Sequence, residues 1–232
     1  MKNLALIFAC FCCFTFSAQI DNCNSYFENN EFEYLLNQIW QGPVFQKVKQ
    51  SEDERNMIKL DPPQYVYGEI TRSGTDSLVM YLCKNNLINK NWSFVDVGSG
   101  FGKMVMHIAL IRGVKKSVGI EILESKNNRA KEAIKSIKGD FPKHKVNFFE
   151  GDILDVSELN FDIIYHNSVS WDKKYIEHIH KIAKKGSIFI TTGNVKSRSG
   201  KYVIENIDKI SVRCSWGNNV DGSPLYIYTI KK

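Results

Sequence analysis

Proline and cysteine are both scarce in this chain of 232 residues. Five prolines accompany fifteen glycines, and no internal repeat or low-complexity tract is present, so there is little room for a long flexible linker. The longest apolar run is shorter than the about 20 residues that a membrane-spanning helix needs. With 43% hydrophobic and 24% charged residues, the composition is that of a globular protein. It excludes a disordered tail, a fibrous repeat and a multi-span membrane protein.

The few cysteines do not predict a disulfide framework or a metal centre. Half of them lie in the apolar run near the N-terminus, and the others are widely spaced, at Cys23, Cys83 and Cys214. No C-x-x-C pair of the kind that binds zinc occurs among these three. Cys83 and Cys214 lie in apolar segments, so we expect them in the core. No metal is implied.

The first eighteen residues have the three parts of a secretory signal peptide. Lys2 supplies the charge, residues 4–16 the short apolar core, and Ser17 and Ala18 the small residues that precede cleavage. We therefore predict a leader over residues 1–18 that directs export and leaves no stable membrane insertion. A buried N-terminal helix is the alternative.

Positive charge gathers in the C-terminal quarter of the chain. Residues 173–232 contain twelve Lys and Arg against four Asp and Glu, whereas the rest of the chain has a net charge of −2. Such a face suits an acidic partner or substrate. A solvated lysine-rich face accounts for the same count.

Short apolar runs alternate with helical stretches through most of the chain. Buried strands are predicted at residues 93–97, 117–121, 146–150, 161–166 and 187–192, followed by two more at 210–216 and 225–230. Helices are expected at residues 31–40, 45–57, 75–86, 102–112, 123–138 and 175–183. This alternation predicts a three-layer α/β fold with a seven-stranded, mostly parallel sheet and an antiparallel C-terminal strand.

A glycine-rich loop follows the first of these strands. Residues 94–102 read Phe-Val-Asp-Val-Gly-Ser-Gly-Phe-Gly, and a helix is expected to begin there. Glycines let the backbone approach a ligand closely, and a helix N-terminus favours an anionic group. Dinucleotide binding is the rival interpretation, but the spacing is G-x-G-x-G rather than G-x-G-x-x-G. Asp96, two residues before the first glycine, suits a ligand that carries an ammonium group.

Two more acids follow the next strands. Glu121 ends the second strand, where a carboxylate can accept both hydroxyls of a ribose. Asp152 follows the third strand and can accept from an adenine amino group, while Ile153 can cover the ring. Because ligands bind at the carboxyl ends of parallel strands, these acids together predict a site for S-adenosylmethionine (SAM).

Residues 94–192 resemble the class I SAM-dependent methyltransferases, whose fold is Rossmann-like. Within that class, the chain is similar to the Dot-one (disruptor of telomeric silencing) histone lysine methyltransferases over about residues 61–230. Three segments carry the resemblance: Asp-Pro-Pro-Gln-Tyr-Val-Tyr-Gly-Glu at 61–69, Ile-Tyr-His-Asn-Ser-Val-Ser-Trp at 164–171, and Ser-Trp at 215–216 with Pro-Leu-Tyr-Ile-Tyr-Thr at 224–229. It implies a methyltransferase domain over 61–232 and a short helical N-terminal extension over 19–60.

The resemblance also implies roles for individual residues. The cofactor-binding positions would be Tyr67, Glu69, Asp96, Gly98, Ser99, Gly100, Gly102, Lys103, Glu121, Asp152 and Ile153. The catalytic channel that positions the substrate lysine would be formed by Asn167, Trp171 and Tyr226. Lys103 and Ile153 stand where the family usually has Gln and Phe.

The implied reaction is methyl transfer from SAM to a lysine amine, most directly a histone lysine. A tight aromatic channel would favour the neutral amine, although the ordinary pKa of lysine is about 10.4. Methylation of another protein, or SAM binding without catalysis, are the alternatives. Methylation of a nucleic-acid base is disfavoured, because residues 166–169 read His-Asn-Ser-Val where an Asn/Asp-Pro-Pro-aromatic motif is expected.

A basic loop and the N-terminal leader bear on the partner that the protein binds and on its compartment. Lys196, Arg198 and Lys201 form a basic loop that could dock on an acidic partner such as a nucleosome, or contact DNA. A solvated loop is the other interpretation. The resembled family is nuclear, whereas the leader suggests export.

Overall fold

The computed structural model describes most of the chain beyond its N-terminal segment. The described residues are 30–42, 51–60, 68–88, 90–167, 173–195, 203–216 and 222–231. The predicted leader, Tyr67, Trp171 and the basic loop with Lys196, Arg198 and Lys201 lie outside these ranges.

Seven strands form a single sheet in the order β3-β2-β1-β4-β5-β7-β6. Their bounds are β1 (Trp92–Val97), β2 (Val114–Glu121), β3 (Val146–Glu150), β4 (Ile163–His166), β5 (Ile188–Thr191), β6 (Val203–Val212) and β7 (Ser223–Lys231). Strands β1 to β5 pair in parallel, whereas β7 is antiparallel to both β5 and β6. The predicted α/β fold with an antiparallel C-terminal strand is confirmed.

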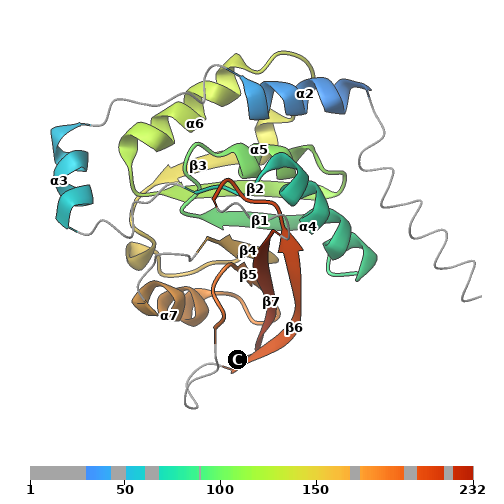
Figure 1. The fold of residues 1–232 in the computed structure, drawn as a ribbon, viewed down its shortest axis with the longest axis vertical. Coiled ribbons are helices and arrows are strands. Elements are labelled where there is room, and N and C mark those ends of the chain that lie inside the picture. The colour runs from blue at the N-terminus through green and yellow to red at the C-terminus, as the bar shows by residue number, and fades with distance from the viewer. Residues whose placement is uncertain are drawn as a thin grey trace, which may run out of the picture.

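Helices lie on both faces of this sheet (Figure 1). They are α2 (Asn30–Gln41), α3 (Glu52–Leu60), α4 (Arg72–Lys84), α5 (Lys103–Leu110), α6 (Glu124–Ser136) and α7 (Lys173–Ile182), with short 3-10 turns η3 (Lys143–Lys145) and η4 (Ile153–Asp155). Within the described ranges, none of the helices is both long and apolar enough to cross a membrane.

The two faces of the sheet bury separate clusters, as the alternation of side chains along each strand requires. Phe94 and Ile163 pack with the apolar sides of α2, α4, α5 and α6. Their neighbours Val95 and Ile164 point to the other face and pack with Ile179 of α7. Helices α2, α4, α5 and α6 therefore cover one face of the sheet, and α7 covers the other (Figure 1).

Two predicted elements differ from the structure. The helix expected over 45–57 begins only at Glu52 in its described part, because Ser51 is its N-cap: the Ser51 hydroxyl accepts from the Glu54 amide and the Glu54 carboxylate accepts from the Ser51 amide. The strand expected over 210–216 instead covers Val203–Val212. Residues 205–209, Glu-Asn-Ile-Asp-Lys, are exposed on this edge strand, so no run of buried apolar residues marks this part of it.

The two described cysteines also differ from expectation. Cys83 is buried in the core, as predicted, but it is also disulfide-bonded, which the widely spaced cysteines had argued against. Its partner lies outside the described residues. Cys214 is free and half-buried, packs against the edge of the core, and pairs with Ile70 in an isolated antiparallel bridge.

Candidate cofactor and substrate site

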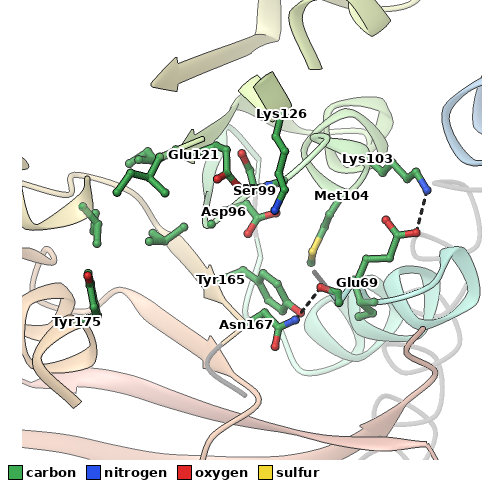
Figure 2. A pocket seen from close by; sticks show the side chains of 18 of the residues that line it. Glu69, Asp96, Ser99, Lys103, Met104, Glu121, Lys126, Tyr165, Asn167 and Tyr175 are labelled. Atoms are coloured by element: carbon green, nitrogen blue, oxygen red, sulfur yellow. Dashed lines mark hydrogen bonds and ion pairs between the residues drawn. The ribbon is translucent and has the colours of Figure 1, made fainter. Parts of the chain in front are cut away.

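A cleft opens at the carboxyl edge of the sheet, where the strand order reverses. Strand β1 has β2 on one side and β4 on the other, and the connections leave in opposite directions, which is where open α/β sheets bind ligands. Asp96 of β1 and Tyr165 of β4 are neighbours in register and both line the cleft. Figure 2 shows its side chains.

The glycine loop forms one wall and is tied to the end of β2. The amides of Gly98 and Ser99 donate to the Ile120 carbonyl oxygen at 2.8 and 3.1 Å, and the Gly100 amide donates to Glu121 at 2.7 Å. Gly102 has φ of +73°, and a Cβ there would overlap the Phe148 ring. This position therefore requires glycine, and the loop can lie close to a ligand.

Two buried carboxyl groups, Asp96 and Glu121, face the middle of the cleft. They are only 5% and 6% exposed. The Glu121 carboxylate accepts from the Gly100 and Leu123 amides, which hold it in place. Burial raises the pKa of Asp96 to about 8, and the neighbouring Glu121 charge adds to the effect. A cationic group on a ligand would favour the ionised form of Asp96. Figure 2 shows Lys126 reaching toward the same pair.

Asp152 and Ile153 border one end of the cleft, as predicted. The Asp152 carboxylate accepts from the Leu154 amide at 2.9 Å and so caps the short turn η4. Ile153 is buried and contributes an apolar surface beside Tyr175 of α7. At this end of the cleft, the Ile153 side chain can cover a flat apolar ring, and the Asp152 carboxylate can accept a hydrogen bond from a polar group on the edge of that ring.

Lys103 and Glu69 lie at the opposite end (Figure 2). Lys103 is the first residue of α5, and its Nζ lies 2.8 Å from Glu69 Oε1. Sequence analysis assigned both residues to the cofactor but did not predict this ion pair. An ammonium group at a helix N-terminus is suited to a carboxylate on the ligand.

Asn167 follows β4 and borders the cleft beside Lys103 and Glu69. Its side-chain amide donates to the Gly68 carbonyl oxygen at 2.9 Å, and its oxygen accepts from Thr192 at 3.0 Å. Residues 68–71 pair in turn with residues 213–216: the Ser215 amide donates to the Glu69 carbonyl oxygen at 2.7 Å. A Cβ at Gly68 would lie 2.7 Å from the Trp216 ring. Residues 68–69, 167 and 215–216, the described parts of the segments that carried the resemblance on this side, thus meet here.

Two of the described site residues, Gly102 and Tyr226, are not among the residues that line the cleft. Tyr226 lies on β7 in register with Thr191 at the carboxyl end of β5. Its ring stacks on Tyr228 at 6.5 Å, and Lys209 Nζ lies 5.6 Å from its centre. A channel role for Tyr226 stays a prediction, as do those of Tyr67 and Trp171 outside the described residues.

Several cleft residues were missed by sequence analysis. They include Trp40, Met104, Lys126, Tyr165 and Tyr175. Of these, Tyr165 could have been found, because alternation along β4 puts it on the same face as Asp96. The buried hydroxyl groups of Ser99 and Tyr165 have no hydrogen-bond partner among the described residues. Both atoms fit a polar ligand in the cleft. The same part of the chain contains no group of three or more metal-ligating side chains.

Comparison with solved structures supports the fold. The chain superimposes on MtNAS, solved in complex with S-adenosylmethionine, with a TM-score of 0.50 and 12% identity over 99% of this chain and 78% of that one. The Pyrococcus horikoshii protein PH1948 gives a TM-score of 0.51 with 12% identity over 79% and 100%. Both comparisons show the same Rossmann-like fold.

The sequence also identifies the family. Residues 61–215 match the family described as "Histone methylation protein DOT1", and the chain belongs to it. A curated relative, "Histone-lysine N-methyltransferase, H3 lysine-79 specific" of Kluyveromyces lactis, is 27% identical over 161 residues. The match covers 63% of this chain and 27% of the relative, so the chain spans about a quarter of that protein.

Proposed function

We propose that this chain is a SAM-dependent protein-lysine N-methyltransferase that acts on histone lysine. The observation that carries the proposal is the position of Asn167, which borders the cofactor cleft and binds the Gly68 carbonyl oxygen beside Trp216. These residues belong to the segments that carry the resemblance to the family, and Gly68 and Asn167 line the cleft.

The residues of the cleft fit SAM along its length. Asp96 would hold the ammonium group and Lys103 the carboxylate of the amino-acid end, while Glu121 would accept from the ribose. Asp152 and Ile153 would hold the adenine. When bound, SAM supplies an electrophilic methyl group on a sulfonium.

The transfer itself needs little acid–base help from the protein. The lysine nitrogen would take the methyl carbon from sulfur, the broken carbon–sulfur bond would leave its electron pair on sulfur, and the amine proton would go to solvent. Asn167 would orient the amine, and the apolar wall of Trp216 would disfavour its charged form by desolvation. Trp171 and Tyr226 complete this proposed channel.

The basic C-terminal quarter supports an acidic protein partner. Lys185, Lys209 and Arg213 are exposed among the described residues, whereas Lys184 and Lys231 form ion pairs with Asp162 and Glu205. A nucleosome is the partner that fits the family, and contact with DNA would follow from the same charge. The affinity for nucleosomes should then fall steeply as salt rises.

The direct test is transfer of a tritiated methyl group from SAM by the full chain. Nucleosomes, free histones and DNA are offered in parallel, with Asn167→Ala as the inactive variant. Asn128→Ala, an exposed asparagine on α6, is the matched control. Label on a histone lysine that Asn167→Ala loses and Asn128→Ala keeps is the expected result.

Two other outcomes would change the proposal. Label only on a different protein would keep the lysine methyltransferase and discard the histone. Binding of S-adenosylhomocysteine (SAH) without transfer to any substrate would favour a SAM-binding module without catalysis.

A further inference from the structure

One wall of the cleft comes from outside the part of the chain that the family matches. Trp40 lies in the last turn of α2, before the matched residues 61–215 begin, and it lines the cleft. Helix α2 is fixed on α5 by its apolar side, with Leu36 and Ile39 fully buried. The N-terminal extension is therefore part of the site.

Trp40 is held from behind by a buried histidine. Its indole Nε1 donates to Nδ1 of His107 at 3.2 Å. His107 lies on α5, is 0% exposed, and brings its Nε2 to 3.1 Å from the Asp76 carboxylate on α4. This contact is electrostatic, because neither of these two atoms has a hydrogen-bond partner among the described residues. Three helices thus converge on one imidazole behind the cleft.

The geometry fixes the protonation of His107. Because Nδ1 accepts from the indole, the ring must be neutral and carry its proton on Nε2, which faces Asp76. Burial lowers the pKa of His107, and the nearby Arg72 charge lowers it further. Asp76 and Glu33 raise this pKa, but their effect is smaller than that of burial. At neutral pH the imidazole is therefore an acceptor that keeps the indole in one orientation.

Trp40 borders the end of the cleft that carries opposite charges. Lys103 Nζ lies 5.7 Å from the centre of the Trp40 ring and pairs with Glu69. Lys103 begins α5 directly after the glycine loop, so this end suits a carboxylate. Asp152 and Ile153, which suit adenine, lie at the other end.

We propose that Trp40 is a cofactor-binding residue that covers the amino-acid end of SAM, and that His107, held by Asp76, is its positioning residue. This inference rests on the proposed SAM-binding function. It assigns a cofactor contact to the N-terminal helix, and it predicts that the two ends of the cofactor respond differently when this wall is removed.

The test compares two ligands that share the adenosine end. SAH has the amino-acid end, whereas 5′-methylthioadenosine lacks it. Calorimetry on the full chain should show that Trp40→Leu weakens SAH about tenfold, or ~1.4 kcal/mol, and changes methylthioadenosine less than about twofold. Tyr34→Leu, an exposed aromatic on the same helix at 49% exposure, is the matched control and should change neither.

The role of His107 is tested by a pair of substitutions. His107→Leu removes the acceptor and should weaken SAH by about threefold or more, again sparing methylthioadenosine. His107→Asn retains an acceptor oxygen near the position of Nδ1 and should recover most of the loss. A merely structural role would lower the melting temperature and weaken both ligands by the same factor.

Fluorescence gives an independent measurement that requires only the conservative Trp40→Phe variant to fold. The difference between wild type and Trp40→Phe isolates the Trp40 emission, which SAH should change and methylthioadenosine should not. Equal effects of the substitutions on both ligands, or no effect, would overturn the role of Trp40 and leave SAM binding intact. A wild-type chain that fails to bind SAH would overturn the proposed function with it.

Discussion

Asn167 and Gly68, ninety-nine residues apart in the sequence, are joined by a 2.9 Å hydrogen bond from the Asn167 side-chain amide to the Gly68 carbonyl oxygen. The bond fixes the end of β4 to the segment that leads into α4. Thr192 fixes the other atom of the same amide group. Asn167 is thus oriented from both sides at the edge of the cleft.

Removing this amide should impair transfer more than cofactor binding. We expect Asn167→Ala to lower kcat with nucleosomes by about 100-fold through lost orientation of the amine. The dissociation constant of SAH should change less than about threefold, because Asp96 and Glu121 lie on other strands. Steady-state kinetics and calorimetry measure the two quantities, and equal losses in both would contradict a positioning role.

Cofactor affinity should depend on pH through Asp96. Its pKa of about 8 means that the carboxyl is largely protonated at pH 7 in the ligand-free protein. A ligand ammonium favours the carboxylate, so binding should release a proton and SAH affinity should rise from pH 6 to pH 8, by up to about tenfold per unit. Calorimetry in two buffers of different ionisation enthalpy detects the proton. Asp155→Asn, an exposed acid nearby, should leave the profile unchanged, whereas Asp96→Asn should flatten it.

The Asp96 carboxyl should also make the stability of the ligand-free protein depend on pH, with stability falling where cofactor affinity rises. The pKa of Asp96 is raised on folding, so between its unfolded value near 3.8 and about 8 the native state binds more protons than the unfolded state. Its contribution to the free energy of unfolding therefore falls as pH rises through that window, by about 1.4 kcal/mol per pH unit in its steepest part. Urea unfolding of ligand-free wild type and Asp96→Asn at pH 6 and pH 8 should show the variant gaining relative stability at the higher pH. An unchanged difference would be evidence against a buried, protonated Asp96.

Substitution of two glycines should distinguish the energetic cost of backbone strain from that of steric overlap. Gly102 and Gly186 both have positive φ, at +73° and +83°, but only at Gly102 would a Cβ meet another residue, Phe148. We expect Gly186→Ala to lower the free energy of unfolding by about 1–2 kcal/mol and Gly102→Ala by roughly 2–5 kcal/mol, since overpacking adds to the strain. Urea unfolding measures both, and equal effects would show that Phe148 yields to the methyl group.

The disulfide of Cys83 should be detectable and stabilising. Peptide mapping without reductant should find Cys83 cross-linked and Cys214 free. Reduction should lower the free energy of unfolding by about 2–4 kcal/mol. Cys83→Ser should have a similar effect, and Cys214→Ser, the matched control, should not. A free Cys83 in protein purified under oxidising conditions would refute the bond.

Much of the fold and part of the site follow from the sequence alone. The alternation of apolar runs, the glycine loop and the acids after three strands are local patterns, and local patterns decide where strands end and helices begin. Because parallel strands share one carboxyl edge, Asp96, Glu121 and Asp152 had to meet there. The family resemblance pointed to Asn167, which lies at the same edge of the sheet.

The other features of the site depend on tertiary packing, which the local sequence does not specify. Trp40 reaches the cleft because α2 packs on α5, and no local pattern specifies which helix will cover an open edge. Lys103 and Glu69 pair, and Tyr226 lies away from the cleft, through contacts between segments far apart in the chain. The pKa of Asp96 depends on burial, which the packing of the whole cleft sets. Sequence therefore determined the elements and their order, whereas packing determined which side chains share the site.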